Sequence, residues 1–349
     1  MAEIRLRISD ELKGQTLYTP VFGSPRAITG IAPTHAPVEL EVFYFIMSLP
    51  HLLLALLANF AWGLNFIAGK IGADQFQPLF FTSIRFAMLL VLMLPWLKPA
   101  PGYTWPLLRV AFLLGVVHFG MIFIGLHAGG NIASIAITTQ LYVPFSAILA
   151  AIVLRERISP VRIVAIIVAL SGVIVIGFDP VVFNHVDAIL WVAGAALAMA
   201  ISTILMRQCP NLGVLRLQAW IALVASPSLL LLSLLFESGQ LQAVREARLF
   251  DFWTPLYSAV GASVIGHGIV YHLLGRYPVA TVTPLLLLAP ILAAIFGVLF
   301  FRDVIGWKLV VGGAMTLLGI LMVTVYPDQK RQDSGGRRSD HKEPLHEDY

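Results

Sequence analysis

The chain has 349 residues, of which 58% are hydrophobic and 12% are charged. Soluble domains carry roughly a quarter charged residues, so this composition excludes a soluble globular protein and indicates a chain that lies in lipid. The isoelectric point of about 9.3 does not indicate a nucleic-acid partner, because most basic residues fall on one predicted side of a membrane. The single cysteine, Cys209, excludes an intramolecular disulfide and a cysteine-based metal cluster, and we expect no cofactor.

Residues 1–49 open the chain and are mostly polar, with several prolines. They contain no apolar run behind a basic start, as a secretory signal would. We expect either a disordered arm or a misassigned start, since Met47 stands directly before the first long apolar stretch. At the other end, residues 327–349 are charged and contain glycine and serine, which predicts a disordered cytoplasmic tail.

Between these ends lie ten apolar stretches long enough to cross a membrane as helices of about 20 residues. We therefore predict an all-α polytopic membrane protein with ten transmembrane helices. In chain order the stretches are 50–70, 77–97, 105–126, 131–154, 160–178, 187–206, 214–236, 252–275, 280–301 and 305–326. The first five form one predicted repeat, residues 50–178, and the last five form a second, residues 187–326.

The fourth and ninth stretches share a pattern of a proline, small apolar residues and a basic–acidic pair. Pro144 is followed 12 residues later by Glu156, and Pro290 is followed 13 residues later by Asp303. An arginine directly precedes each of the two acids. A final apolar helix that contains glycines follows each copy, so the similarity extends beyond the single helix.

The third and eighth stretches match as well. Pro106 and His118 correspond to Pro255 and His267 at one common offset of 149 residues. Chance similarity between Leu-rich and Ala-rich helices is the alternative explanation, but matched proline, histidine and arginine–acid positions are not general features of lipid-facing helices. The sequence therefore indicates a duplicated unit of five helices.

A five-helix unit crosses the membrane an odd number of times, so the second copy must enter from the opposite face. The basic residues agree with this inversion, because short cytoplasmic loops carry an excess of Lys and Arg. With the N-terminus inside, few basic residues lie outside, namely Lys70, Arg245, Arg248, Arg302 and Lys308. We predict two inverted repeats in the bacterial inner membrane, with both termini cytoplasmic. Such repeats form midplane substrate sites in many secondary transporters.

Four short segments carry a family resemblance. They are Trp-Gly-Leu-Asn-Phe-Ile-Ala-Gly-Lys at 62–70, Pro-Leu-Phe-Phe-Thr-Ser-Ile-Arg-Phe at 78–86, Val-Pro at 143–144 with Arg-Glu-Arg at 155–157, and Leu-Gly-Arg-Tyr at 274–277. They resemble the EamA family of the drug/metabolite transporter superfamily, and three of them look closest to O-acetylserine/cysteine exporters. The resemblance covers about 50–326. It implies ten helices in two inverted repeats, a central cavity and efflux of small amino-acid-like metabolites.

The chain departs from the family pattern at one pair of positions. A Gly-Glu pair usually follows helices 4 and 9 in the family, whereas this chain has Arg155-Glu156 and Arg302-Asp303. The fold assignment does not depend on this pair, but details of gating are not transferred to this chain.

Arg85 lies about two turns into the second predicted helix, and no Asp or Glu falls in the interior of any predicted helix. An ionisable residue inside a membrane is costly and marks a functional site by default. Arg85 either extends along its helix to the interface, as long basic side chains do, or provides a fixed positive charge that attracts a substrate carboxylate.

Two histidines at equivalent positions mark the third and eighth helices. Ser263, His267 and Tyr271 recur at four-residue spacing, so they share one face of the eighth helix. His118 is the counterpart of His267 in the third helix. We expect His118, His267 and Tyr271 to line the substrate pathway; hydrogen bonds that only hold helices together are the alternative.

Trp62 and Asn65 lie three residues apart on one face of the first helix. Interfacial tryptophans gather near helix ends, and Trp62 does not. We expect these two residues to form part of the pathway wall, with simple packing of the indole ring as the alternative.

The fourth helix has a polar N-terminal half that includes Gln140 and Tyr142, followed by Pro144. A proline removes one backbone donor and exposes a carbonyl group one turn earlier. The ninth helix repeats this pattern with Pro284 and Pro290. We expect Gln140 and Tyr142 to face substrate and the three prolines to mark moving elements; static kinks are the alternative.

Taken together, these features predict a secondary-type transporter that exports small amino acids or related metabolites by alternating access, either facilitative or coupled to protons through a histidine. A drug or nucleotide-sugar carrier of the same superfamily is the alternative, followed by a channel or a non-transporting sensor. An intramembrane enzyme would need a nucleophile–base pair or a metal site, and the sequence holds no HExxH or GxSxG motif. The predicted partners are a small-molecule substrate, the bilayer and, as one option, a second copy in a homodimer.

Overall fold

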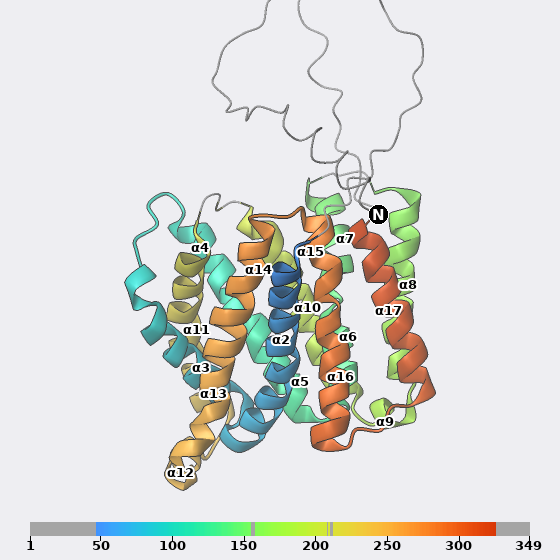
Figure 1. The fold of residues 1–349 in the computed structure, drawn as a ribbon. Helices are drawn as coiled ribbons and strands as arrows, with labels where there is room; N and C mark the ends of the chain where they lie inside the picture. The colour runs from blue at the N-terminus through green and yellow to red at the C-terminus, as the bar shows by residue number, and fades with distance from the viewer. Residues whose placement is uncertain (1–46, 155–157, 208, 210–211, 326–349) are drawn as a thin grey trace, which may run out of the picture. The chain divides into compact units, whose positions relative to one another are not determined.

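The computed structural model of this chain describes residues 47–154, 158–207, 209 and 212–325. Most of the predicted N-terminal arm, the predicted tail, and the Arg155-Glu156 pair lie outside the described residues. Within the described ranges every regular element is a helix, which confirms the all-α prediction (Figure 1).

Nine helices of the described part are long and apolar enough to cross a membrane. In the first half they are built from α2 (Leu49–Phe76), α3 (Pro78–Met93) with η2 (Leu94–Trp96), α4 (Thr104–Ala111) with η3 (Phe112–His118) and α5 (Phe119–Ala128), α6 (Ile132–Thr139) with α7 (Tyr142–Leu154), and α8 (Pro160–Gly177). In the second half they are built from α10 (Val186–Met206), α11 (Val214–Phe236), α15 (Val279–Leu286) with α16 (Leu288–Phe301), and α17 (Trp307–Val325). The connections contain α9 (Pro180–Phe183), α12 (Gln240–Glu246) and η4 (Leu249–Phe252).

The remaining predicted stretch, 252–275, is helical too but is not among these nine. It consists of α13 (Trp253–Tyr257), η5 (Ser258–Gly266) and α14 (His267–Leu274), which follow one another without a gap. Two serines and two histidines lie within these bounds, so the run is less apolar than the other long helices.

The first helix is longer than the sequence predicts. The predicted stretch ends at Lys70, but α2 continues to Phe76. The Lys70 Nζ atom lies 2.9 Å from Asp74 Oδ1 one turn later. This pairing offsets the charges of both side chains, so the extension beyond the apolar run remains helical.

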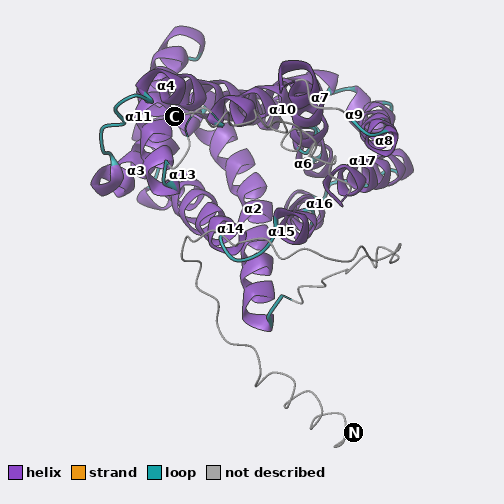
Figure 2. Cartoon of the chain, turned by 90° about the horizontal axis from the view of Figure 1, so that it is seen from above, coloured by secondary structure: helices purple, strands orange, loops and turns teal. Residues whose placement is uncertain are grey.

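Helix α2 lies in the middle of the bundle (Figure 2). It packs against η5 and α14 on one side and against α16 on the other. Helix α10 makes the corresponding contacts with η3 and α5 and with α7. Helices α8 and α17 pack against each other at the edge of the bundle (Figure 1).

Two segments, η3 and η5, are π-helices, whose turns are wider than those of an α-helix. His118 is the last residue of η3, and His267 directly follows η5. π-Turns are rare and are frequently found at functional sites, where they displace backbone carbonyl groups from the regular ladder. The two histidines that the sequence paired therefore stand at the same kind of backbone distortion.

The fourth and ninth stretches are each broken about one turn before a proline. Helix α6 ends at Thr139, a few residues before α7 reaches its buried Pro144. Helix α15 contains Pro284 and ends at Leu286, four residues before Pro290. A proline cannot bond the carbonyl four residues earlier and its ring collides with it, which explains both breaks.

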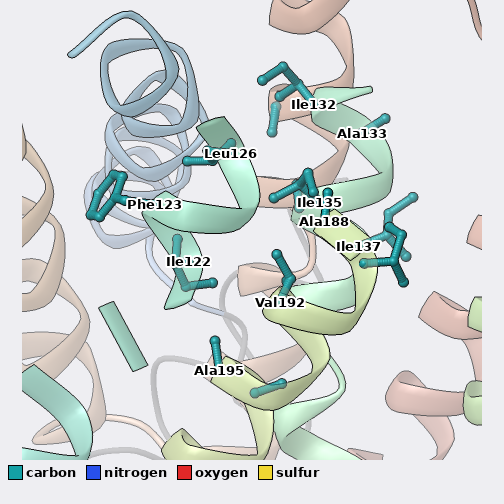
Figure 3. Packing of buried hydrophobic residues seen from close by; sticks show 14 of the residues in the cluster. Ile122, Phe123, Leu126, Ile132, Ala133, Ile135, Ile137, Ala188, Val192 and Ala195 are labelled. Carbon is teal, nitrogen blue, oxygen red and sulfur yellow. The ribbon is translucent and has the colours of Figure 1, made fainter. Parts of the chain in front are cut away.

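The apolar core has its largest cluster where α5, α6 and α10 meet (Figure 3). The side chains that meet there are mostly β-branched or small, so the helices approach closely. Figure 3 labels Ile122, Phe123, Leu126, Ile132, Ala133, Ile135, Ile137, Ala188, Val192 and Ala195. This core fixes α10 relative to the first half of the chain.

Carboxylates from distant segments of the chain cap two helix N-termini. Asp303 Oδ2 accepts a hydrogen bond of 2.7 Å from the backbone nitrogen of Ile132, which opens α6. Burial raises the pKa of the Asp303 carboxyl above its ordinary value, while the hydrogen bond from Ile132 and the charge of Lys70 oppose that rise. Glu237 accepts from the backbone nitrogens of Leu79 (2.7 Å) and Phe80, which open α3.

We expect Glu237→Ala to destabilise the protein by about 0.5–2 kcal/mol, because the residue that precedes α3 provides no side-chain cap of its own. The measurement is the thermal unfolding midpoint of the detergent-solubilised protein. Glu246→Ala is the matched control, because Glu246 is exposed and its side chain bonds to that of Gln242 on the same short helix. Equal midpoints for the two variants would contradict the capping role.

Candidate functional site

Polar side chains of α2 and α3 meet the π-helix η5 inside the apolar bundle. Trp62 Nε1 donates to the carbonyl oxygen of Ala262 at 3.2 Å. Ser258 Oγ donates to Asn65 Oδ1 at 2.7 Å. We call this cluster the η5 network; its members are Trp62, Asn65, Arg85, Gln218, Ser258, Ala262, Ser263 and His267.

The π-helical turn explains why so many side chains bond to backbone carbonyl groups here. Ser263 Oγ donates to the Ser258 carbonyl at 3.2 Å, and His267 Nδ1 bonds to the Ala262 carbonyl at 3.0 Å. Each pair is five residues apart, the spacing of a π-turn. Gln218 Nε2 of α11 donates to the Ser263 carbonyl at 2.9 Å. The side chains thus add partners to carbonyl groups of the π-turn; the Ala262 carbonyl also accepts from the backbone nitrogen of His267.

Arg85 is the charged member of the network. The side chain is 1% exposed, and Nη2 donates to Ser263 Oγ at 3.0 Å. The guanidinium carbon lies 4.3 Å from the ring centre of Phe119, with Phe86 and Phe123 slightly farther away. Arg85 therefore does not extend to the membrane interface, and the snorkelling interpretation is wrong.

Two of the three guanidinium nitrogens of Arg85, Nε and Nη1, have no hydrogen-bond partner in the described part of the chain. Nor does any described carboxylate form an ion pair with it. Neighbouring aromatic faces attract a cation but accept none of its hydrogen bonds in the ordinary sense. Arg85 is thus a buried positive charge with unused donors.

The two histidines make similar contacts with backbone carbonyl groups. His118 Nδ1 lies 2.8 Å from the carbonyl oxygen of Ala195 in α10, as His267 Nδ1 lies near Ala262. A carbonyl oxygen can only accept, so both imidazoles donate from Nδ1. The ring of His118 lies 4.8 Å from that of Phe119, and the face of Phe119 covers the Arg85 guanidinium.

An aromatic column leads from the network toward the surface. The rings of Trp62 and His267 are 5.2 Å apart in a T-shaped arrangement, and those of His267 and Tyr271 are stacked at 6.3 Å. Tyr271 is 37% exposed. The shared helix face that the sequence predicts for His267 and Tyr271 is therefore present.

The other expected pathway residues lie apart from the network. Gln140 directly follows the last residue of α6, and Tyr142 begins α7 and packs at the margin of the core cluster. Within the described residues, neither side chain hydrogen-bonds to the η5 network. The structure thus brings together Trp62, Asn65, Arg85, His118, His267 and Tyr271, and leaves Gln140 and Tyr142 beside the broken fourth helix.

Two polar side chains of the network were not predicted from the sequence. Gln218 lies near the start of a long, mostly apolar helix, and Ser258 is a small residue at a position suited to packing. Both matter because of the π-turn. Gln218 donates to the Ser263 carbonyl, and the Ser258 carbonyl accepts from the Ser263 hydroxyl. For Ser258 the one signal in the sequence is the unusual polarity of the stretch 252–275, which distinguishes that stretch from its neighbours.

Comparison with known proteins agrees with this architecture. The model of the EamA-like transporter family matches twice, over residues 49–178 and 187–325. A protein of Salmonella typhimurium named "Probable amino-acid metabolite efflux pump" is 29% identical over 78% of this chain and 94% of its own length. Its namesake in Escherichia coli is 27% identical over 76% and 92%. An "Uncharacterized transporter" of Archaeoglobus fulgidus is 25% identical over 78% and 97%.

A solved crystal structure has a similar fold. It superposes with a TM-score of 0.54 at 16% identity and covers 79% of this chain and 96% of its own. At that identity the similarity concerns the fold alone. The two family matches together span most of the chain, and they coincide with the apolar helices that flank the η5 network. The chain is a multi-pass membrane protein of the EamA-like transporter family.

Proposed function

We propose that this protein is a secondary-type transporter that exports small amino acids or related metabolites across the bacterial inner membrane. The η5 network is the observation that carries this proposal. Polar and charged groups inside an apolar bundle are costly and mark substrate pathways. The names of the Salmonella typhimurium and Escherichia coli relatives support an amino-acid metabolite as the substrate and efflux as the direction.

The transport mechanism we infer is alternating access between two inverted repeats of five helices, with both termini in the cytoplasm. Three observations support it. The family model matches two consecutive segments of similar length. The π-helices η3 and η5 and the two proline breaks stand at equivalent positions. Helix α2 packs on η5 and α16 as α10 packs on η3 and α7.

The hydrogen bonds of the network join the two proposed repeats. Trp62, Asn65 and Arg85 belong to the first repeat, and their partners lie in η5 of the second. A rocking motion of one repeat against the other must break these bonds. Polar groups of a substrate can replace them, so binding lowers the cost of the motion.

We expect His267→Ala to lower export by at least about tenfold, because it leaves the Ala262 carbonyl with one partner fewer and removes the ring between Trp62 and Tyr271. The measurement is growth tolerance of cells to a panel of toxic amino-acid analogues and drugs, followed by efflux from preloaded vesicles. His272→Ala is the matched control, because His272 is exposed and contacts Arg276 instead.

Tolerance that extends to amino-acid analogues and is lost only in the His267 variant supports the proposal. Tolerance restricted to unrelated drugs points to the drug-carrier alternative. The inverted architecture has its own test in reporter fusions at Glu156 and Asp303, which must report opposite sides of the membrane. Fusions that report the same side would exclude inverted repeats.

A further inference from the structure

The Ser263 hydroxyl has two partners of opposite character. It accepts a hydrogen bond of 3.0 Å from Arg85 Nη2 and donates one of 3.2 Å to the Ser258 carbonyl oxygen. A single hydroxyl thus bridges a fixed cation and a backbone acceptor. A serine hydroxyl carries no charge and satisfies only one of the guanidinium nitrogens.

An α-amino acid offers the same two functions in charged form. Its carboxylate accepts hydrogen bonds from a guanidinium, because the two groups are complementary in geometry and opposite in charge. Its ammonium group donates to carbonyl oxygens, and both groups sit on one carbon atom. We propose that Arg85 binds the α-carboxylate of a zwitterionic amino acid while the Ser258 carbonyl accepts from its α-ammonium group, with the Ser263 hydroxyl holding their place when no substrate is bound.

Charge and burial support this assignment. The Arg85 side chain is among the largest that the bundle fully encloses, and within the described residues no carboxylate pairs with it. A buried cation without a counterion is costly. A bound carboxylate removes that cost. It also provides an acceptor for the Nε and Nη1 donors, which have no partner in the empty protein. A purely cationic ligand would do neither, and a neutral ligand would supply no counter-charge.

The surroundings restrict the bound molecule further. Phe86, Phe119 and Phe123 cover the guanidinium, so a large anion such as a nucleotide would displace several rings. Ser258 itself donates to Asn65, which keeps its carbonyl oriented within η5. The site therefore favours a compact zwitterion. This assignment rests on the proposed function for its physiological meaning but concerns binding alone.

The experiment compares four congeners on the purified full-length protein: alanine, alaninamide, ethylamine and propionate. The readout is the shift in thermal unfolding midpoint with ligand concentration, for the wild type and for Arg85→Gln and Ser263→Ala. In the wild type we expect alanine to bind about tenfold to a hundredfold more tightly than alaninamide or ethylamine, and more tightly than propionate. Arg85→Gln should reduce the preference for alanine over alaninamide to about one.

Ser263→Ala provides a result that a merely structural serine would not give. Removing the internal competitor should tighten alanine binding by about twofold to tenfold, whereas loss of a structural bond would weaken it. Equal binding of alanine and alaninamide to the wild type, retained preference in Arg85→Gln, or no shift with any congener overturns the assignment. Efflux of alanine from vesicles is scored separately, so binding with this preference but without efflux leaves the site standing and contradicts the transport proposal.

Discussion

Replacing Gly172 by leucine is expected to separate α8 from α17 and to remove most of the folded protein. A Cβ atom on Gly172 would lie 2.6 Å from the Thr316 backbone nitrogen and still closer to the carbonyl oxygen of Gly312. Backbone atoms of a neighbouring helix cannot move aside without moving the helix. Small residues at such crossings provide the close contact that holds membrane helices together. We expect a loss of about 3 kcal/mol or more.

The measurement is the yield of monodisperse protein after solubilisation, together with its unfolding midpoint. Gly177→Leu is the matched control, because Gly177 lies in the same helix and a Cβ atom added there would meet no described atom within 4 Å. The control should behave like the wild type. If both variants fold equally well, α8 and α17 do not cross at Gly172.

Replacing Arg85 by methionine is expected to stabilise the empty protein while abolishing export. The guanidinium is buried with two nitrogens unpartnered, so its removal relieves a desolvation cost that no described counterion offsets. Methionine fills a similar volume and packs well against Phe86, Phe119 and Phe123. We expect the free energy of unfolding to rise by about 1–4 kcal/mol, as when buried charges are replaced by apolar residues.

The two quantities are the unfolding midpoint without ligand and the rate of efflux from vesicles. Arg216→Met is the control, because Arg216 lies in the first turn of α11 and its Nε donates to the Lys98 carbonyl oxygen. That variant should gain no stability. A lower midpoint for Arg85→Met would mean that the aromatic rings and Ser263 already compensate the charge. The main physical argument for Arg85 as a substrate-binding residue would then fail.

Sequence patterns identified the helices well because the apolar runs alone determine which segments can enter lipid. Matched prolines and histidines further indicated where the chain repeats. Trp62, Asn65, Arg85 and His267 could be selected because a polar group inside an apolar helix is rare enough to be noticed. Those four do meet in the η5 network.

Other features depend on contacts between distant segments and left no local trace. The direction of Arg85 was open, since only the surrounding phenylalanines and Ser263 decide between burial and the interface. Nor do propensities reveal the π-turn of η5, which depends on side chains five residues apart and on Trp62 from another helix. The cap that Glu237 gives to α3 spans 158 residues of sequence.

The bonds between α2 or α3 and the helical run α13–η5 have a consequence for the populations of the two conformational states that the proposed alternating access requires. Four hydrogen bonds hold this contact: Trp62 to Ala262, Ser258 to Asn65, Arg85 to Ser263, and Tyr257 to Ala61. Each contributes a net free energy of about 0.5–1.5 kcal/mol, so parting them costs on the order of a few kcal/mol. A gap of that size leaves the opened form as a minority of roughly 0.1–10% at equilibrium. Thermal motion alone can therefore sample both forms, without an external energy source.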